Sequence, residues 1–181
     1  MHELETERLR LVPLAEADLD ALHLLWTDPD VRRYLWDDVL ISREQASEII
    51  RTSVSNFAEC GFGFWAMFPR EFDSDAIGFC GFRQFEETGE PELLYGVLPR
   101  YWGKGLVTEA AHAVVRYGFD VRGFKRIIAA TDTPNQSSVR VMQRLGMVFE
   151  RRRLFHGLDT VFYELTPEGY AEYGKIQLRQ R

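Results

Sequence analysis

The sequence predicts a mixed α/β protein whose elements follow the order β-α-α-β-β-β-α-β-α-β-β. Short segments with apolar residues at every second position predict strands, and longer segments with apolar residues at helical spacing predict helices. Glycine and proline separate these segments. A chain of 181 residues with 45% hydrophobic content can bury one substantial core. Since no repeat or linker divides the chain, we expect a single domain over residues 1–181.

The first half of the chain is expected to hold one strand, two helices and an antiparallel pair of strands. Leu9 and Leu11 alternate with polar residues, as in a strand. A helix follows and stops at Asp28-Pro29, because the residue before proline avoids the helical region. Ser42 and Gln45 have the spacing of a capping box, which begins the second helix. The expected ranges are strand 9–14, helix 19–26, helix 42–57, strands 62–68 and 77–85, and a turn at 73–75.

The second half begins with an apolar strand that leads through a glycine-rich turn into a helix. That helix has apolar residues at helical spacing from Leu106 onward. Another helix opens at Pro134 or Asn135 and ends at Gly146. His156-Gly157 marks the turn of a closing hairpin. The expected ranges are strand 92–98, helix 106–118, strand 126–131, helix 135–146, strands 147–155 and 161–165, and a tail helix over 167–181.

The turn between the strand and helix 106–118 has the pattern of a phosphate-binding turn. Arg100, Gly103 and Gly105 form Arg-x-x-Gly-x-Gly immediately before the helix. Unpaired N–H groups and the positive end of the helix dipole favour an anion there, and glycine lets the backbone approach it closely. A P-loop would need Ser or Thr after Lys104, and a dinucleotide fingerprint would need glycine at Thr108. Both of these alternatives are therefore excluded.

The turn resembles the acetyl-CoA pyrophosphate loop of the GNAT N-acetyltransferase superfamily, whose signature is Gln/Arg-x-x-Gly-x-Gly/Ala. Residues 133–147 resemble the Asn-x-x-Ser/Ala element that follows the fifth strand of that superfamily. Residues 6–11 and 157–163 resemble its branch of ribosomal-protein N-terminal acetyltransferases (RimJ/RimL-like). The resemblance implies a mostly antiparallel central sheet of about seven strands, with helices on both faces and a splay between the fourth and fifth strands. It also implies that acetyl-CoA donates its acetyl group directly to an amine.

The resemblance also implies which residues bind acetyl-CoA. The main chain at 100–105 would hold the diphosphate, and the Thr108 hydroxyl could contact it from the first helical turn. Backbone groups at Tyr95 and Val97 would pair with the pantetheine arm, which Asn135 would also contact. Whether the side chains of the two cations in the turn contact the anion or remain solvated is open. The full set is Tyr95, Val97, Leu98, Arg100, Trp102, Gly103, Lys104, Gly105, Thr108, Asn135 and Ser138.

Amine attack on the thioester needs an oxyanion donor and a neutral amine. By analogy with the superfamily, the N–H of Val97 or Leu98 would be the donor, whereas Pro99 has no N–H. An α-amine has a pKa of about 8 and needs less help to lose its proton than lysine does. Glu92, at the start of the strand, matches the position of the general base in some members. The alternative is that Glu92 is only an exposed charge at a strand end, and Glu86 and Glu90 compete for the role.

The chain departs from the superfamily where the departing thiolate receives its proton. Many members have tyrosine seven residues after the asparagine, but this chain has Met142, which has no proton to give. Ser138 could donate a hydrogen bond to the sulfur, or could only pack at the start of a helix. Tyr163 and Tyr95 are the alternatives. The missing tyrosine leaves open a non-catalytic acyl-CoA-binding module.

Composition limits the partners and the compartment. The formal net charge of −6 argues against nucleic acid as a partner, and we expect the three arginines at 151–153 to form a solvated strand edge. Two cysteines are too few for a disulfide framework, so we expect a cytoplasmic protein. No apolar run is long enough for a membrane span, and the four histidines have no metal-ligand spacing.

The acceptor depends on variable segments. We expect a protein N-terminal amine, then a small amine or polyamine. Asp37 and Asp38 would suit a cationic acceptor. The pattern is compatible with a monomer or a homodimer. Glu109 and His112 are expected to be surface residues, and most aromatic residues between Trp26 and Trp65 are expected to be core.

Overall fold

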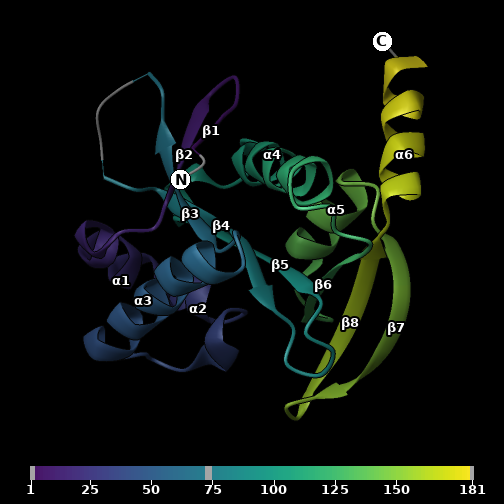
Figure 1. Cartoon of the computed structure of the whole chain (residues 1–181). Helices are drawn as coiled ribbons and strands as arrows, with labels where there is room; N and C mark the ends of the chain where they lie inside the picture. Colours follow the sequence, from purple (N-terminus) through teal and green to yellow (C-terminus); the bar gives the residue numbers. More distant parts are fainter. Residues whose placement is uncertain (1–2, 72–74, 180–181) are drawn as a thin grey trace. The chain divides into compact units, whose positions relative to one another are not determined.

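The computed structural model describes residues 3–71 and 75–179 (Figure 1). The turn expected at 73–75 therefore lies largely outside the described residues. The chain forms two compact units. The first contains Met1–Arg83 with Leu94–Val114, and the second contains Gln84–Leu93 with Val115–Arg181. The single domain expected from composition stays a prediction.

The strands form an eight-stranded sheet in the order β1-β2-β3-β4-β5-β6-β8-β7. β5 and β6 pair in parallel, whereas β1–β2, β2–β3, β3–β4, β6–β8 and β7–β8 pair antiparallel. Seven strands match the expected ones, and the eighth is β1, which is too short to leave an alternating pattern. The bounds are β1 Leu4–Glu5, β2 Leu9–Pro13, β3 Phe64–Pro69, β4 Gly78–Gln84, β5 Pro91–Val97, β6 Ile127–Asp132, β7 Val148–Phe155 and β8 Leu158–Leu165.

The helices follow the expected order, with one short addition near the start. Asp28 ends the first helix as expected, but its carboxylate also accepts hydrogen bonds from the N–H groups of Asp30 (3.0 Å) and Val31 (3.3 Å). It therefore caps a short second helix that begins at Pro29, a favoured first position for proline. The bounds are α1 Leu19–Thr27, α2 Pro29–Arg32, α3 Arg43–Glu59, α4 Leu106–Asp120, α5 Gln136–Arg144 and α6 Pro167–Arg179.

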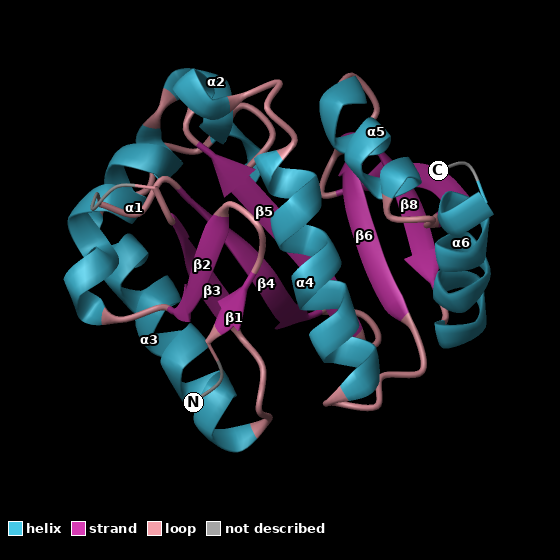
Figure 2. Ribbon diagram, turned by 90° about the horizontal axis from the view of Figure 1, so that it is seen from above, coloured by secondary structure: helices cyan, strands magenta, loops and turns pink. Residues whose placement is uncertain are grey.

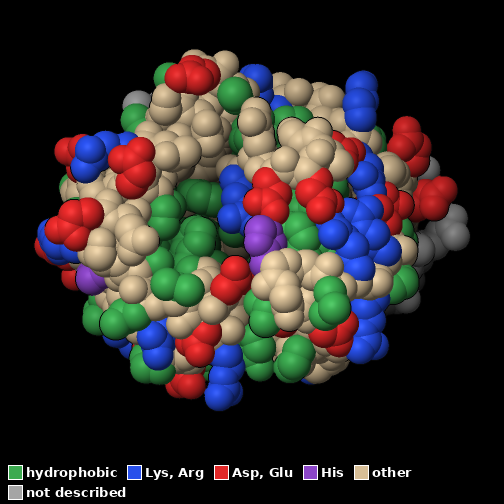
Figure 3. Space-filling view, turned by 90° about the horizontal axis from the view of Figure 1, so that it is seen from below, with side chains coloured by type: hydrophobic (Ala, Val, Ile, Leu, Met, Phe, Trp, Pro, Cys, Tyr) green, Lys and Arg blue, Asp and Glu red, His purple; other side chains and the backbone are tan. Residues whose placement is uncertain are grey.

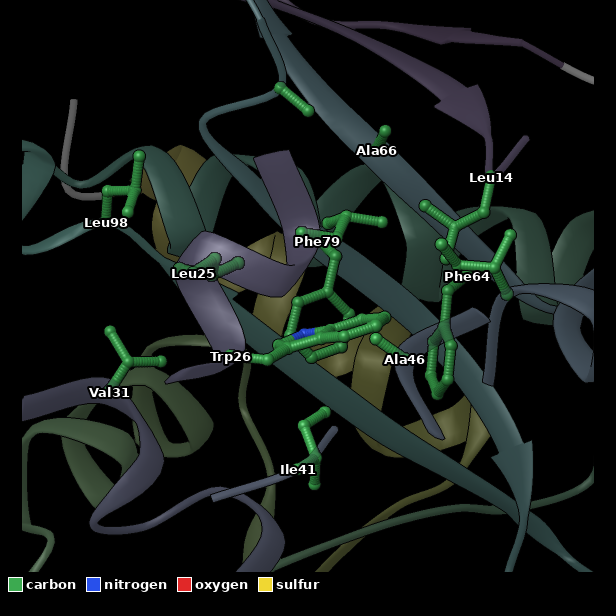
Figure 4. Packing of buried hydrophobic residues seen from close by; sticks show 13 residues of the cluster. Leu14, Leu25, Trp26, Val31, Ile41, Ala46, Phe64, Ala66, Phe79 and Leu98 are labelled. Carbon is green, nitrogen blue, oxygen red and sulfur yellow. The ribbon is translucent and has the colours of Figure 1, made fainter. Parts of the chain in front are cut away.

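The core of the first unit surrounds Trp26 of α1 (Figure 4). Trp26 is fully buried, and its ring packs edge-on against Phe79 of β4 with centroids 5.7 Å apart. The ring of Trp36 packs edge-on against Trp26 at the same distance. The expectation that aromatic residues here are core is confirmed for Trp26 and Trp65, which are fully buried, whereas Tyr34 is exposed. Helix α3 begins at the expected capping box, since Ser42 and Gln45 exchange side-chain to backbone hydrogen bonds.

The second unit holds β6, β8 and β7 with α5 and α6, which appear together in Figure 2. Phe85, Ile128 and Phe162 form its buried cluster. The β7–β8 hairpin turns at His156 and Gly157, both with positive φ, as the right-handed twist of the two strands requires.

Arg126, just before β6, joins β7, β8 and the loop that precedes β5. Its guanidinium lies 2.5 Å from Glu164, 2.8 Å from Glu150 and 3.0 Å from Glu90. Burial acts to lower the pKa of Arg126, but hydrogen bonds with Glu164 and Glu90 raise it, so the guanidinium stays charged.

β7 lies at the edge of the sheet, as expected, and its three arginines are half-buried or exposed, but they also make defined contacts. Arg151 and Arg153 lie over the ring of Phe162, with Cζ 4.7 and 5.0 Å from its centroid. Arg153 also pairs with Glu87, and Arg152 is bidentate to Asp159. Figure 3 shows basic and acidic side chains interspersed on the face seen from below. Buried aromatic surface and matched carboxylates therefore fix these arginines.

Candidate active site

The glycine turn lies in the first unit, between β5 and α4. A 3₁₀ turn, Pro99–Tyr101, follows the strand, and α4 begins at Leu106. Gly103 and Gly105 have φ values of +74° and +75°, which side chains other than glycine rarely adopt. A Cβ placed on Gly103 would meet no heavy atom within 4 Å. The turn is therefore open at Gly103, and its alternating backbone has the form of an anion-binding nest.

The side chains of the turn contact Tyr101 and the end of β5. The cationic groups of Arg100 and Lys104 lie 5.1 and 5.2 Å from the ring centroid of Tyr101. Trp102 is half exposed, and its indole N–H donates to the carbonyl of Val97 at 2.8 Å. The ring of Tyr101 thus stabilises both cations beside the turn, and the indole ties the turn back to β5.

A contact that the sequence did not predict braces this turn from the start of the chain. Arg8 Nη1 donates to the carbonyl of Lys104 at 2.9 Å, and Arg8 Nε donates to Oε2 of Glu109 at 2.6 Å. Glu109 also accepts from the Thr6 hydroxyl at 2.6 Å. Glu109 is partly exposed, with 18% of its side chain accessible, so it lies at the surface as expected but is held there by these contacts. The partners are about a hundred residues apart, so no local pattern could reveal the contact.

The pKa of Glu109 reflects this bracing. Burial acts to raise the pKa, but the hydrogen bonds from Thr6 and Arg8 together lower it below its ordinary value. The carboxylate therefore remains charged and holds the arginine in place.

Strand β5 offers fewer oxyanion donors than the sequence predicted. The N–H of Leu98 donates to the carbonyl of Ile77 at 2.9 Å, so it is already used inside the first unit. This contradicts Leu98 as the donor. Val97 is buried and Tyr95 is half-buried. Val97 thus stays as the candidate donor.

Glu92 differs from the two carboxylates that compete with it. Glu92 is only 4% exposed and pairs in register with Ile128 of β6. The alternative of an exposed charge at a strand end is therefore wrong. Glu90 is paired with Arg126, and Glu86 is paired with His156. Since a buried carboxylate is costly, its retention within a sheet is typical of a functional residue.

The second unit brings Asn135 and Ser138 together at the start of α5. The side-chain oxygen of Asn135 accepts from the N–H of Ser138 at 3.2 Å, and its Nδ2 donates to the Thr131 hydroxyl at 3.0 Å. Asn135 is thus the N-cap of α5. Met142 is fully buried, and the ring of Tyr163 packs edge-on against Phe149.

In the part of the chain that the structure describes, no group of three or more His, Cys, Asp or Glu side chains could hold a metal ion. Within the same residues, no helix combines the length and apolar character needed to cross a membrane.

Comparisons with known proteins connect this geometry to a family. Residues 8–148 match the family described as acetyltransferase (GNAT) domain. The chain is 31% identical over 180 residues to the uncharacterized N-acetyltransferase p20 of Bacillus licheniformis, covering 94% of this chain and 99% of that protein. It is 24% identical to the spermidine N(1)-acetyltransferase of Escherichia coli K12, covering 78% of this chain and 74% of that protein.

Solved structures of acetyltransferases have the same fold as this chain. A GNAT-family acetyltransferase from Bacillus anthracis superposes with a TM-score of 0.78 at 25% identity, covering 92% of this chain and 99% of that one. RimL, a ribosomal L7/L12 alpha-N-protein acetyltransferase in complex with coenzyme A, shares the fold, with a TM-score of 0.76 at 16% identity over 93% of this chain and 99% of its own. The GNAT-like mixed α/β fold expected from the sequence is confirmed. The chain belongs to the GNAT acetyltransferase family.

Proposed function

We propose that this protein binds acetyl-CoA through the main chain of residues 100–105 and transfers the acetyl group to an amine in a ternary complex. The observation that carries the proposal is the open turn at Gly103 and Gly105, both with positive φ, directly before a helix of 15 residues. Main-chain N–H groups at such a helix start suit a diphosphate. The Thr108 hydroxyl, one turn into the helix, is a further proposed contact.

In the proposed reaction, a neutral amine nitrogen attacks the thioester carbonyl and forms a tetrahedral oxyanion. The N–H of Val97 is the proposed oxyanion donor, because the N–H of Leu98 is already bonded to Ile77. The C–S bond then breaks, and the amide product loses a proton while the thiolate gains one. This scheme needs no covalent enzyme intermediate.

Glu92 is the proposed general base. Its burial within β5 favours it over Glu86 and Glu90, which precede the strand. An α-amine, with a pKa of about 8, loses its proton near neutral pH more easily than a lysine side chain, with a pKa of about 10.4, so it needs less help from a base. Glu92 could therefore act through an intervening water.

Ser138 is the proposed donor to the thiolate, with Tyr163 as the alternative. The backbone N–H of Ser138 lies within the cap formed by Asn135, so its position at the start of α5 is fixed. Asn135 is proposed to contact the pantetheine arm in addition to its capping role. Met142 is fully buried and has no proton to donate.

The proposed acceptor is a protein N-terminal amine, in line with the RimJ/RimL-like branch. The fold shared with RimL supports this choice. Asp37 and Asp38 would suit a cationic acceptor of either kind, and Asp38 also pairs with Arg32 at 3.4 Å. Trp36, Asp37 and Asp38 all have positive φ, a strained backbone that is often retained at binding sites. Similarity to a spermidine N(1)-acetyltransferase supports a polyamine as the alternative.

Release of free thiol from acetyl-CoA, followed by mass spectrometry of the products, tests this proposal. The panel contains a peptide with a free α-amine and no lysine, the same peptide blocked at its N-terminus with one lysine added, and spermidine. We expect thiol release with the first peptide and acetylation of its α-amine. Thiol release with spermidine but with neither peptide would favour a polyamine as the acceptor. CoA binding without thiol release from any amine would favour a non-catalytic acyl-CoA-binding module.

A further inference from the structure

The peptide group between Lys104 and Gly105, in the centre of the glycine turn, is held by Arg8 from the turn that joins β1 and β2. The Arg8 Nη1 donates to the Lys104 carbonyl at 2.9 Å. In a planar trans peptide, the C=O and the following N–H point in opposite directions. Because the Lys104 carbonyl points to Arg8, the N–H of Gly105 points away from Arg8. The arginine therefore sets the direction of a main-chain donor that it does not itself touch.

Arg8 can do this because its own position is fixed by Glu109 in the first turn of α4. Nε and Nη2 of Arg8 both lie 2.6 Å from Oε2 of Glu109. The other carboxylate oxygen accepts from the main-chain N–H of Arg8 at 2.8 Å and from the Thr6 hydroxyl at 2.6 Å. One guanidinium thus spans the helix start and the turn, which a planar fork can do and a single ammonium cannot.

The two glycines make this control necessary. With φ near +75°, Gly103 and Gly105 have access to more backbone conformations than other residues, so the two peptide groups between them, including Lys104–Gly105, can rotate at little steric cost. A Cβ on Gly105 would lie 3.7 Å from Arg8 Nη2, so the guanidinium packs closely along this part of the turn. A turn that is free to rotate would lose entropy on binding an anion, whereas a braced turn is already ordered.

We propose that Arg8 is a positioning residue that orients the Lys104–Gly105 peptide so that the Gly105 N–H faces the diphosphate of CoA. This inference rests on the proposed binding of CoA by residues 100–105. According to this inference, the Thr6–Arg8 segment raises the affinity for CoA without touching the phosphates. The side chains of Thr6 and Arg8 bond instead to the glycine turn and to α4. A carboxylate beside an anion site is unfavourable by itself, but Glu109 is needed there because it holds Arg8.

The test compares three variants with the wild type. Arg8→Gln removes the charge and the fork, Arg8→Lys keeps the charge without the fork, and Arg10→Gln removes the same charge from a neighbouring site. Arg10 is the matched control because it is exposed and its guanidinium lies over Phe68, 5.3 Å from the ring centroid. Calorimetry measures CoA binding, and NMR titration measures binding of pantetheine, which lacks the diphosphate. Circular dichroism checks that each variant is folded.

We expect Arg8→Gln to weaken CoA binding about tenfold, the scale of one misdirected hydrogen bond to a charged group. Arg8→Lys should lose nearly as much, Arg10→Gln should bind like the wild type, and pantetheine affinity should be unchanged throughout. Full recovery in Arg8→Lys would overturn the inference, because charge alone would then suffice. Equal losses for CoA and pantetheine would overturn it as well.

CoA binding by the wild-type protein distinguishes a failure of this inference from a failure of the proposed function. If the folded wild type does not bind CoA, the proposed function fails, and the inference fails with it. If the wild type binds CoA and Arg8→Gln binds equally well, only the positioning role of Arg8 is overturned.

Discussion

Replacing Gly103 by alanine separates anion binding from folding. Gly103 has a φ of +74°, and a Cβ there would meet no heavy atom within 4 Å. The folded protein can therefore accommodate the methyl group, at a cost that comes from the backbone conformation alone. That cost is about 1–2 kcal/mol for an L-residue in the left-handed region. The methyl group would, however, occupy the open side of the turn that we assign to the diphosphate.

Gly89 provides the matched control, because its φ is +71° and its Cβ would also meet nothing within 4 Å. We expect Gly103→Ala and Gly89→Ala to lower the free energy of unfolding by the same 1–2 kcal/mol or so in urea titrations. Only Gly103→Ala should weaken CoA binding, by about 100-fold, or about 2.7 kcal/mol, if it disrupts one or two hydrogen bonds to the charged diphosphate. Equal CoA affinity in the two variants, measured by calorimetry, would refute the assignment of the turn.

Three further changes test the catalytic carboxylate, the core of the second unit and the acid side of the Glu109 contact. Glu92→Gln should lower turnover about 100-fold while CoA affinity stays constant, as expected for loss of a general base; unchanged turnover would exclude that role. Phe162→Ala should cost about 3–5 kcal/mol of unfolding free energy in urea, because Phe162 is fully buried, whereas Leu154→Ala, at a side chain 73% exposed, should cost less than about 0.5 kcal/mol. A similar cost at both positions would contradict the core assignment. Since the folded pKa of Glu109 is lowered, its carboxylate stabilises the protein above the ordinary glutamate value of about 4.3, and this contribution is lost as pH falls through the lower folded value. The stability gap between the wild type and Glu109→Gln should therefore be present at neutral pH and shrink in acid, and a gap that does not change with pH would contradict the contact.

Local signals made most of the fold predictable from the sequence. The capping box at Ser42 begins α3, and positive φ at Gly146 and Gly157 ends α5 and turns the β7–β8 hairpin, as expected. Each of these features depends on residues within a few positions of one another. The short helix α2 was missed because the same two residues, Asp28 and Pro29, end α1 and begin α2. A proline that stops one helix therefore hid the start of the next.

The candidate site was only partly predictable, because long-range contacts decide what its residues do. The glycine turn was visible as a local motif, but its brace by Arg8 joins residues nearly a hundred positions apart. The hydrogen bond that removes Leu98 as an oxyanion donor is accepted by the carbonyl of Ile77, which lies just before β4. Burial of Glu92 likewise depends on β6, which the sequence places more than thirty residues later. Only the folded structure shows which polar groups already have hydrogen-bond or ion-pair partners and which side chains are buried.

Backbone amide NMR during titration with CoA tests the central claim most directly. We predict saturable shifts that are largest for the N–H groups of Gly103, Lys104 and Gly105, with the Gly105 signal moving downfield as a new hydrogen bond forms. The N–H of Trp102 is already bonded to the carbonyl of Pro99 at 3.0 Å and should shift less. Saturable CoA binding that leaves the three signals in place would contradict the claim, as would a folded protein whose spectrum does not respond to CoA.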